Sequence, residues 1–168
     1  MNYLILVAAA AIALVVGSIW YHPKVMGTAW MKANGMDPNA EPTGNMAIIL
    51  ISAFVMAFFI AFCLQGMVLH QLGVFQLVAG YPEMEDPNSA VHQAVKTFLT
   101  TYGQNHMTFG HGMLHGVIAG LFFATPVLGI NALFERRGWA YIGIHAGYWV
   151  ITLGLMGGLI CQFVRFPI

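Results

Sequence analysis

The stretch "MAIILISAFVMAFFIAFCLQGMVL", residues 46–69, contains no Asp, Glu, Lys or Arg. A helix that crosses the roughly 30 Å of hydrocarbon in a bilayer needs about 20 mostly apolar residues. The run also lacks the alternation of apolar and polar side chains that the strands of a membrane β-barrel show. The sequence of this stretch therefore predicts a transmembrane helix.

Three further runs have the same character, at residues 3–21, 109–134 and 139–163, and none of them contains Asp, Glu, Lys or Arg. Charged residues make up 7% of the chain, against about 25% in ordinary soluble domains, and the mean hydropathy is +0.75. These features predict an all-α integral membrane protein. We expect residues 1–168 to form a single transmembrane domain of four helices that run up and down.

Two of the connections are predicted to contain short helices that lie at the membrane interface. In residues 22–36, Pro23 suits the first turn of a helix and Gly35 suits its C-terminal cap. In residues 88–103, Asn88 or Ser89 is the candidate N-cap, and the apolar residues that follow share one helical face.

The basic residues predict how the chain is oriented in the membrane. Lys24 and Lys32 lie between the first two spans, and Arg136 and Arg137 lie between the last two. Up-and-down helices place these two connections on the same side, and basic residues concentrate on the cytoplasmic side. We therefore expect both termini and residues 71–108 to lie outside. The basic connections are also expected to contact anionic lipid.

Glycines recur on one face of each of the last two spans. A glycine face lets two helix backbones approach closely, which favours helix association where lipid removes the hydrophobic driving force. We expect these faces to pack the third and fourth spans tightly together, or to assemble the protein with a second copy or a partner. The glycines are Gly112, Gly116, Gly120, Gly143, Gly147, Gly154 and Gly158.

The start of the third span carries histidines at a spacing that brings their side chains together. His111 and His115 are four residues apart, so a helix places both on one face, where neutral imidazoles can bind a divalent metal. Further ligands must come from the same end of the molecule. The candidates are His70, His106 and His92, with Glu83 or Glu85 as additional ligands. The metal-site hypothesis joins His70, His106, His111 and His115.

Two other interpretations of these histidines stay open. Imidazole titrates near physiological pH, so the pair could pass protons or handle a solute. The rings could instead form only hydrogen bonds to neighbouring helices or to lipid headgroups. In each case we expect the rings of His111 and His115 to point into the protein and away from lipid.

Two longer stretches resemble a known family. These are "VGSIWYHPKVMGTAWMKANGM" (16–36) and "PVLGINALFERRGWAYIGIHAGYWVITLGLMGG" (126–158), which resemble the bacterial family called domain of unknown function 1761. The most specific parts are the Trp-Tyr-x-Pro stretch and the Asn-x-Leu-Phe-Glu-Arg-Arg stretch. The resemblance covers most of the chain. It implies a small multi-pass protein of the bacterial cytoplasmic membrane, and it implies no activity.

The sequence contains none of three motifs that mark common enzyme classes. It has no Gly-x-Ser-x-Gly, no His-Glu-x-x-His and no phosphate-binding glycine loop, and no span contains a carboxylate that could couple ion transport. We expect that the protein is not an enzyme and that it binds no cofactor other than a divalent metal. We also expect it to contact the lipid bilayer and not to bind nucleic acid. A structural or accessory subunit assembled through the glycine faces is the first hypothesis. The alternative is a transporter, channel or metal-handling protein that uses the outer histidines.

Overall fold

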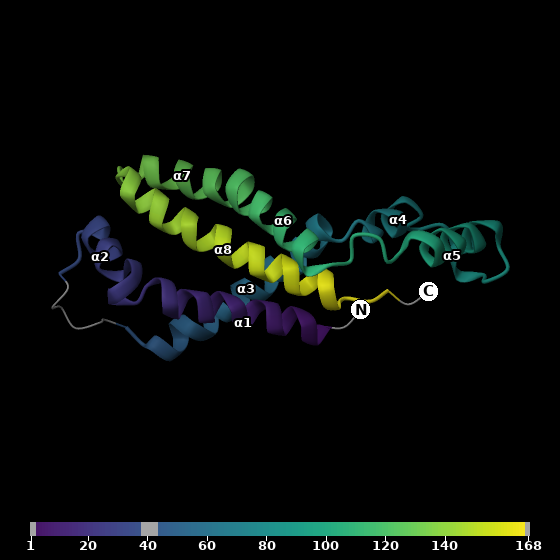
Figure 1. Ribbon diagram of the computed structural model, residues 1–168, viewed down its shortest axis with the longest axis horizontal. Coiled ribbons are helices and arrows are strands. Elements are labelled where there is room, and N and C mark those ends of the chain that lie inside the picture. The colour runs from purple at the N-terminus through teal and green to yellow at the C-terminus, as the bar shows by residue number, and fades with distance from the viewer. Residues whose placement is uncertain (1–2, 38–43, 167–168) are drawn as a thin grey trace.

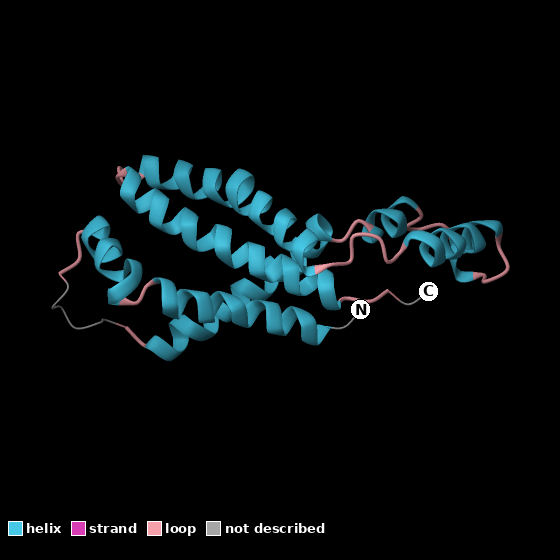
Figure 2. Ribbon diagram, viewed as in Figure 1, coloured by secondary structure: helices cyan, strands magenta, loops and turns pink. Residues whose placement is uncertain are grey.

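A computed structural model describes residues 3–37 and 44–166, and within these ranges the regular structure is all helical, with no strand (Figure 2). The four apolar runs form helices that are long and apolar enough to cross a membrane. They are α1 (Tyr3–Trp20), α3 (Met46–Val68), the continuous helix α6–η3–α7 (Phe109–Ala119, Gly120–Ala124 and Thr125–Phe134) and α8 (Trp139–Phe163).

The long helices lie side by side, and α8 is the most buried of them (Figure 1). It contacts α1, α3, α6 and α7, so the other long helices all pack on α8. The start of α1 and the end of α8 lie at one end of the molecule, next to α4 (Gln71–Leu77) and α5 (Ala90–Tyr102). The helix α2 (Thr28–Asn34) lies at the opposite end together with the turn between α7 and α8.

The first connection contains the predicted short helix. It begins with a π-helical turn, η1 (Pro23–Gly27), continues as α2, and ends at Gly35, whose φ of 70° is the left-handed conformation that glycine adopts without strain. The hydroxyl of Thr28 donates to the carbonyl of Pro23 at 2.9 Å, which supports the wide first turn.

The second connection contains the predicted helix and one more. The helix α5 begins after Ser89, whose side chain accepts a hydrogen bond from the backbone N–H of His92. A 3₁₀ turn, η2 (Pro82–Glu85), precedes it. The helix α4 was not predicted, because seven residues form a stable helix only with tertiary support. That support includes the stacking of Phe75 on Phe166, with ring centroids 5.7 Å apart.

The third span is helical throughout but contains the π-helical turn η3 in its middle, which the sequence analysis did not predict. Pro126 follows this turn and has no N–H to donate to the preceding turn, so the regular α-helical ladder is interrupted there. The hydroxyl of Thr125 donates to the carbonyl of Gly120 at 2.8 Å. This is the same five-residue spacing that supports the turn in η1.

The helices α6 and α8 are in direct backbone contact through glycine. A Cβ atom added at Gly112 would overlap the carbonyl group of Gly157, and one added at Gly116 would overlap the carbonyl group of Leu153. At Gly120 an added Cβ would lie 2.6 Å from the Cα of Val150. The third and fourth spans therefore form a tight antiparallel pair that only glycine permits at these positions.

The glycines of the fourth span divide among several neighbours instead of sharing one partner. Gly154 and Gly158 face α6, but Gly147 faces the ring of Trp20 in α1. A Cβ added at Gly143 would meet nothing within 4 Å, so Gly143 does not take part in the packing within the chain, and its role in assembly with a second copy or a partner stays a prediction. The physical reason is that α6 and α8 are in closest contact near the start of α6, and Gly143 lies near the other end of α8. The close contact includes Gly157, which the sequence analysis had not selected.

This packing predicts different outcomes for two matched glycine substitutions. Gly116→Ala should lower the free energy of unfolding by about 2–3 kcal/mol, because the added Cβ forces two backbones apart. Gly143→Ala should leave stability unchanged or raise it by up to about 1 kcal/mol, because helical glycine costs backbone entropy. Unfolding titrations in mixed micelles measure both effects. Equal stability of the two variants would contradict the backbone contact.

Candidate metal centre

Three chain segments bring histidines to the end of the molecule where α6 begins, which we call the histidine end. Val68 ends α3, and His70 then occupies the N-cap position of α4. His111 and His115 lie on the first two turns of α6, whose N-cap is Thr108. The side chain of Gln162 in α8 accepts a hydrogen bond from the N–H of Phe109 at 2.9 Å, so α8 also caps the start of α6.

The histidine side chains form one cluster. The Nε2 atoms of His70 and His111 lie 2.9 Å apart, which is a hydrogen bond between two imidazoles. The ring centroid of His115 lies 4.6 Å from that of His111 and 5.0 Å from that of His70. One ligand nitrogen from each of these three residues lies within 4.8 Å of the other two.

His106 joins the cluster from the segment before α6. Its ring centroid lies 4.8 Å from that of His111 and 5.9 Å from that of His70. Its φ of 65° places it in the left-handed region, which non-glycine residues adopt at some energetic cost. Its carbonyl accepts from the N–H of Thr108 at 2.8 Å and from the thiol of Cys161 at 3.2 Å. The backbone at His106 is therefore held from both sides.

Gln71 fixes the loop that leads to His106. Its side-chain Nε2 donates to the carbonyl of Gly103 at 2.9 Å and to that of Asn105 at 3.0 Å, and the residue is buried. Because Gln71 directly follows His70, this pair of hydrogen bonds ties the position of His70 to that of His106. The sequence analysis missed Gln71, Gln162 and Cys161. Their partners are backbone groups far away in the chain, which a sequence pattern does not reveal. The one signal in the sequence is that each is a polar side chain or thiol among apolar residues.

The predicted additional ligands lie elsewhere. The Nδ1 of His92 is 2.9 Å from the carbonyl of Met84, so its ring stabilises the start of α5. Neither Glu83 nor Glu85 belongs to the group of ligand atoms among the described residues. His111 and His115 are half-buried and their rings lie against those of other histidines, whereas His70 and His106 are exposed at the histidine end.

The three close histidines have the chemistry of a transition-metal site. Tetrahedral zinc has Zn–N distances of about 2.0–2.1 Å, which places its nitrogen ligands about 3.4 Å apart. The ligand nitrogens of His70, His111 and His115 all lie within 4.8 Å of one another, which is close to that separation. In the structure, His70 and His111 form a hydrogen-bonded pair, and the ring of His115 lies beside them.

Comparison with known proteins identifies the family. The family described as "Protein of unknown function (DUF1761)" matches residues 4–161. The chain belongs to this family. The resemblance seen in residues 16–36 and 126–158 is thereby confirmed. No curated protein and no solved structure matches the chain, so the DUF1761 assignment carries no activity with it.

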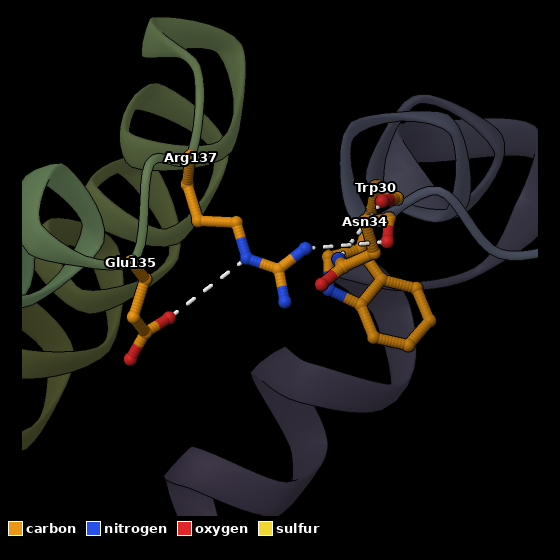
Figure 3. A network of polar contacts seen from close by, with 4 residues as sticks. All are labelled: Trp30, Asn34, Glu135 and Arg137. Atoms are coloured by element: carbon orange, nitrogen blue, oxygen red, sulfur yellow. Dashed lines mark hydrogen bonds and ion pairs between the residues drawn. The ribbon is translucent and has the colours of Figure 1, made fainter.

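The opposite end of the molecule, which we call the cationic end, contains the basic residues that were predicted to set the orientation. These are Lys24, Lys32, Arg136 and Arg137. Figure 3 shows Arg137 between two partners: its Nε lies 3.8 Å from a carboxylate oxygen of Glu135, and its Nη1 donates to the carbonyl of Asn34 at 3.3 Å. The side chain of Asn34 in turn donates to the carbonyl of Trp30. Arg137 therefore links α2 to the α7–α8 turn.

A tyrosine–histidine pair near the cationic end was not predicted. The hydroxyl of Tyr21 lies 2.9 Å from the Nδ1 of His145, and its ring packs edge-on against Trp30. Burial, followed by the neighbouring Tyr148 and Tyr141, raises the pKa of Tyr21 above its usual range. The hydroxyl therefore stays neutral and serves as a hydrogen-bond partner. The pair joins α1 to α8, so we assign it a structural role.

Proposed function

We propose that this DUF1761 protein is a multi-pass protein of the bacterial cytoplasmic membrane that binds a divalent transition-metal ion at its histidine end. The observation that carries the proposal is the group formed by His70, His111 and His115, whose ligand nitrogens lie within 4.8 Å of one another. Two imidazoles from α6 and one from the N-cap of α4 form a ligand set that zinc, nickel and copper favour.

The membrane part of the proposal rests on the surface of the long helices. Large apolar side chains are exposed along them, among them Ile48, Ile51, Phe59 and Phe122. Contiguous exposed apolar surface of this kind is unfavourable in water and favourable in lipid. The basic residues of the cationic end favour placing that end in the cytoplasm. The metal site would then face outside, together with both chain termini.

We propose binding rather than catalysis. A catalytic zinc site commonly pairs the metal-bound water with a nearby carboxylate as general base. In the described part of the chain, no Asp or Glu belongs to the ligand group, and none lines the pocket that His70 and His106 border. The geometry therefore favours metal handling at the outer face of the cytoplasmic membrane. This function was the alternative hypothesis drawn from the sequence.

Assembly as a subunit through glycine faces stays a prediction with less support. Most of the predicted glycine set already has neighbours within the chain, and among the set only Gly143 has no neighbour within 4 Å. The glycine surface was expected either to pair the last two spans or to bind a partner, and most of it is occupied within the chain, by the contact of α6 with α8 and by Trp20. A partner would have to bind a different surface.

Metal binding predicts a stability change that depends on the cluster. Zinc added to metal-stripped protein in detergent should raise the Tm, since a ligand at 100 times its Kd stabilises the folded state by about 2.7 kcal/mol. His115→Ala should abolish this rise, because it removes one of three ligands. His92→Ala, at the same end but outside the cluster, should keep it. If zinc, nickel and copper leave the Tm unchanged, the histidines serve hydrogen bonding alone.

The orientation predicts which positions an impermeant thiol reagent reaches in intact cells. In a Cys63→Ala, Cys161→Ser background, Asn88→Cys should label from outside, and Met36→Cys should label only after the cells are permeabilised. Both positions are exposed, and they lie at opposite ends of the molecule. Labelling of Met36→Cys in intact cells would reverse the proposed orientation.

A further inference from the structure

A pocket of about 430 Å³ lies between α4 and α5 and adjoins the histidine cluster. His70 and His106 form part of its wall. Its size falls in the range of about 300–1,000 Å³ that is typical of small-molecule sites. Since His70 is also one of the three close histidines, a metal ion at that centre would lie next to the pocket.

Most of the side chains in the remaining wall of the pocket are apolar or aromatic. They include Val74 of α4 and Phe98, Leu99 and Tyr102 of α5. The side-chain Nε2 of Gln71, which also lines the pocket, donates hydrogen bonds to the carbonyls of Gly103 and Asn105, so its N–H groups are not free for a ligand. The polar side chains of the pocket are therefore concentrated at the wall formed by His70, His106 and the neighbouring Asn105, and the lining contains no acidic residue.

The coordination chemistry leaves one position for an outside ligand. Three histidines supply three ligands, and zinc sites with three protein ligands keep a fourth position for water or another molecule. His106 does not belong to the group whose ligand atoms lie within 4.8 Å of one another, although its ring is near. A divalent ion held by three neutral imidazoles keeps its full positive charge, so an anionic donor is favoured in the fourth position.

We propose that the metal ion held by His70, His111 and His115 opens its fourth coordination position to this pocket, which binds a small carboxylate with an apolar body. The carboxylate coordinates the metal and the apolar body lies against Phe98 and Tyr102. This inference rests on the proposed metal site. It extends that function by naming the class of molecule that the site recognises together with the metal.

Cobalt provides the test, because its visible absorption changes when a ligand enters its coordination sphere. Co²⁺-loaded protein in detergent is titrated with benzoate and with acetate. Both carboxylates should change the spectrum, and benzoate should do so at a concentration at least about tenfold lower, because the ring is buried in the pocket. Val74→Trp fills the pocket and should remove the preference for benzoate while keeping the response to acetate. Leu77→Trp, at an exposed position of the same helix, should keep the preference.

Each contrary result has a distinct meaning. If Co²⁺ binds but neither carboxylate changes the spectrum, the fourth position is closed, and a response that appears only in His106→Ala identifies His106 as the fourth ligand. Equal responses to benzoate and acetate would overturn the role of the pocket. If Co²⁺ does not bind at all, the proposed metal site fails, and the inference fails with it.

Discussion

Backbone contact between α6 and α8 is the interaction on which the rest of the structure depends. Gly112 and Gly116 bring the backbone of α6 directly against carbonyl groups of Gly157 and Leu153. In lipid, where apolar side chains gain little from leaving the solvent, such close packing supplies the favourable contact between helices. Because α8 also contacts α1, α3 and α7, this helix pair serves as the centre on which the other elements are placed.

The same contact determines where the histidines lie. His111 is adjacent to Gly112 and His115 is adjacent to Gly116, so glycines that face α8 turn the imidazoles toward a different side of α6. The end of α8 supplies Gln162 and Cys161, which hold the start of α6 and the carbonyl of His106. The end of α3 then brings His70 within hydrogen-bond distance of His111. The stretch of sequence at the start of α6 therefore determines both the helix packing and the position of the histidines.

Much of this arrangement could be predicted from sequence, since four long uncharged runs and a pair of histidines four residues apart leave few alternatives. Other segments also contribute histidines to the cluster, and these could be predicted only as candidates. Helical periodicity does not show which loop residue lies next to a given helix end. That is why His92 was considered beside His70, and why Gln71 was missed. The turn η3 was also missed, because Thr125 and Pro126 change the local hydrogen bonding without changing the apolar pattern.

The central claim is that three histidines from the end of α3 and the start of α6 form one metal centre. X-ray absorption at the zinc edge of the zinc-loaded protein tests it most directly. The account predicts one zinc per chain with three imidazole nitrogens and one further light-atom ligand at about 2.0–2.1 Å. It also predicts two imidazoles in His70→Ala, since His70 is one of the three. Zinc with a single imidazole, or the same imidazole number in both proteins, would contradict the claim.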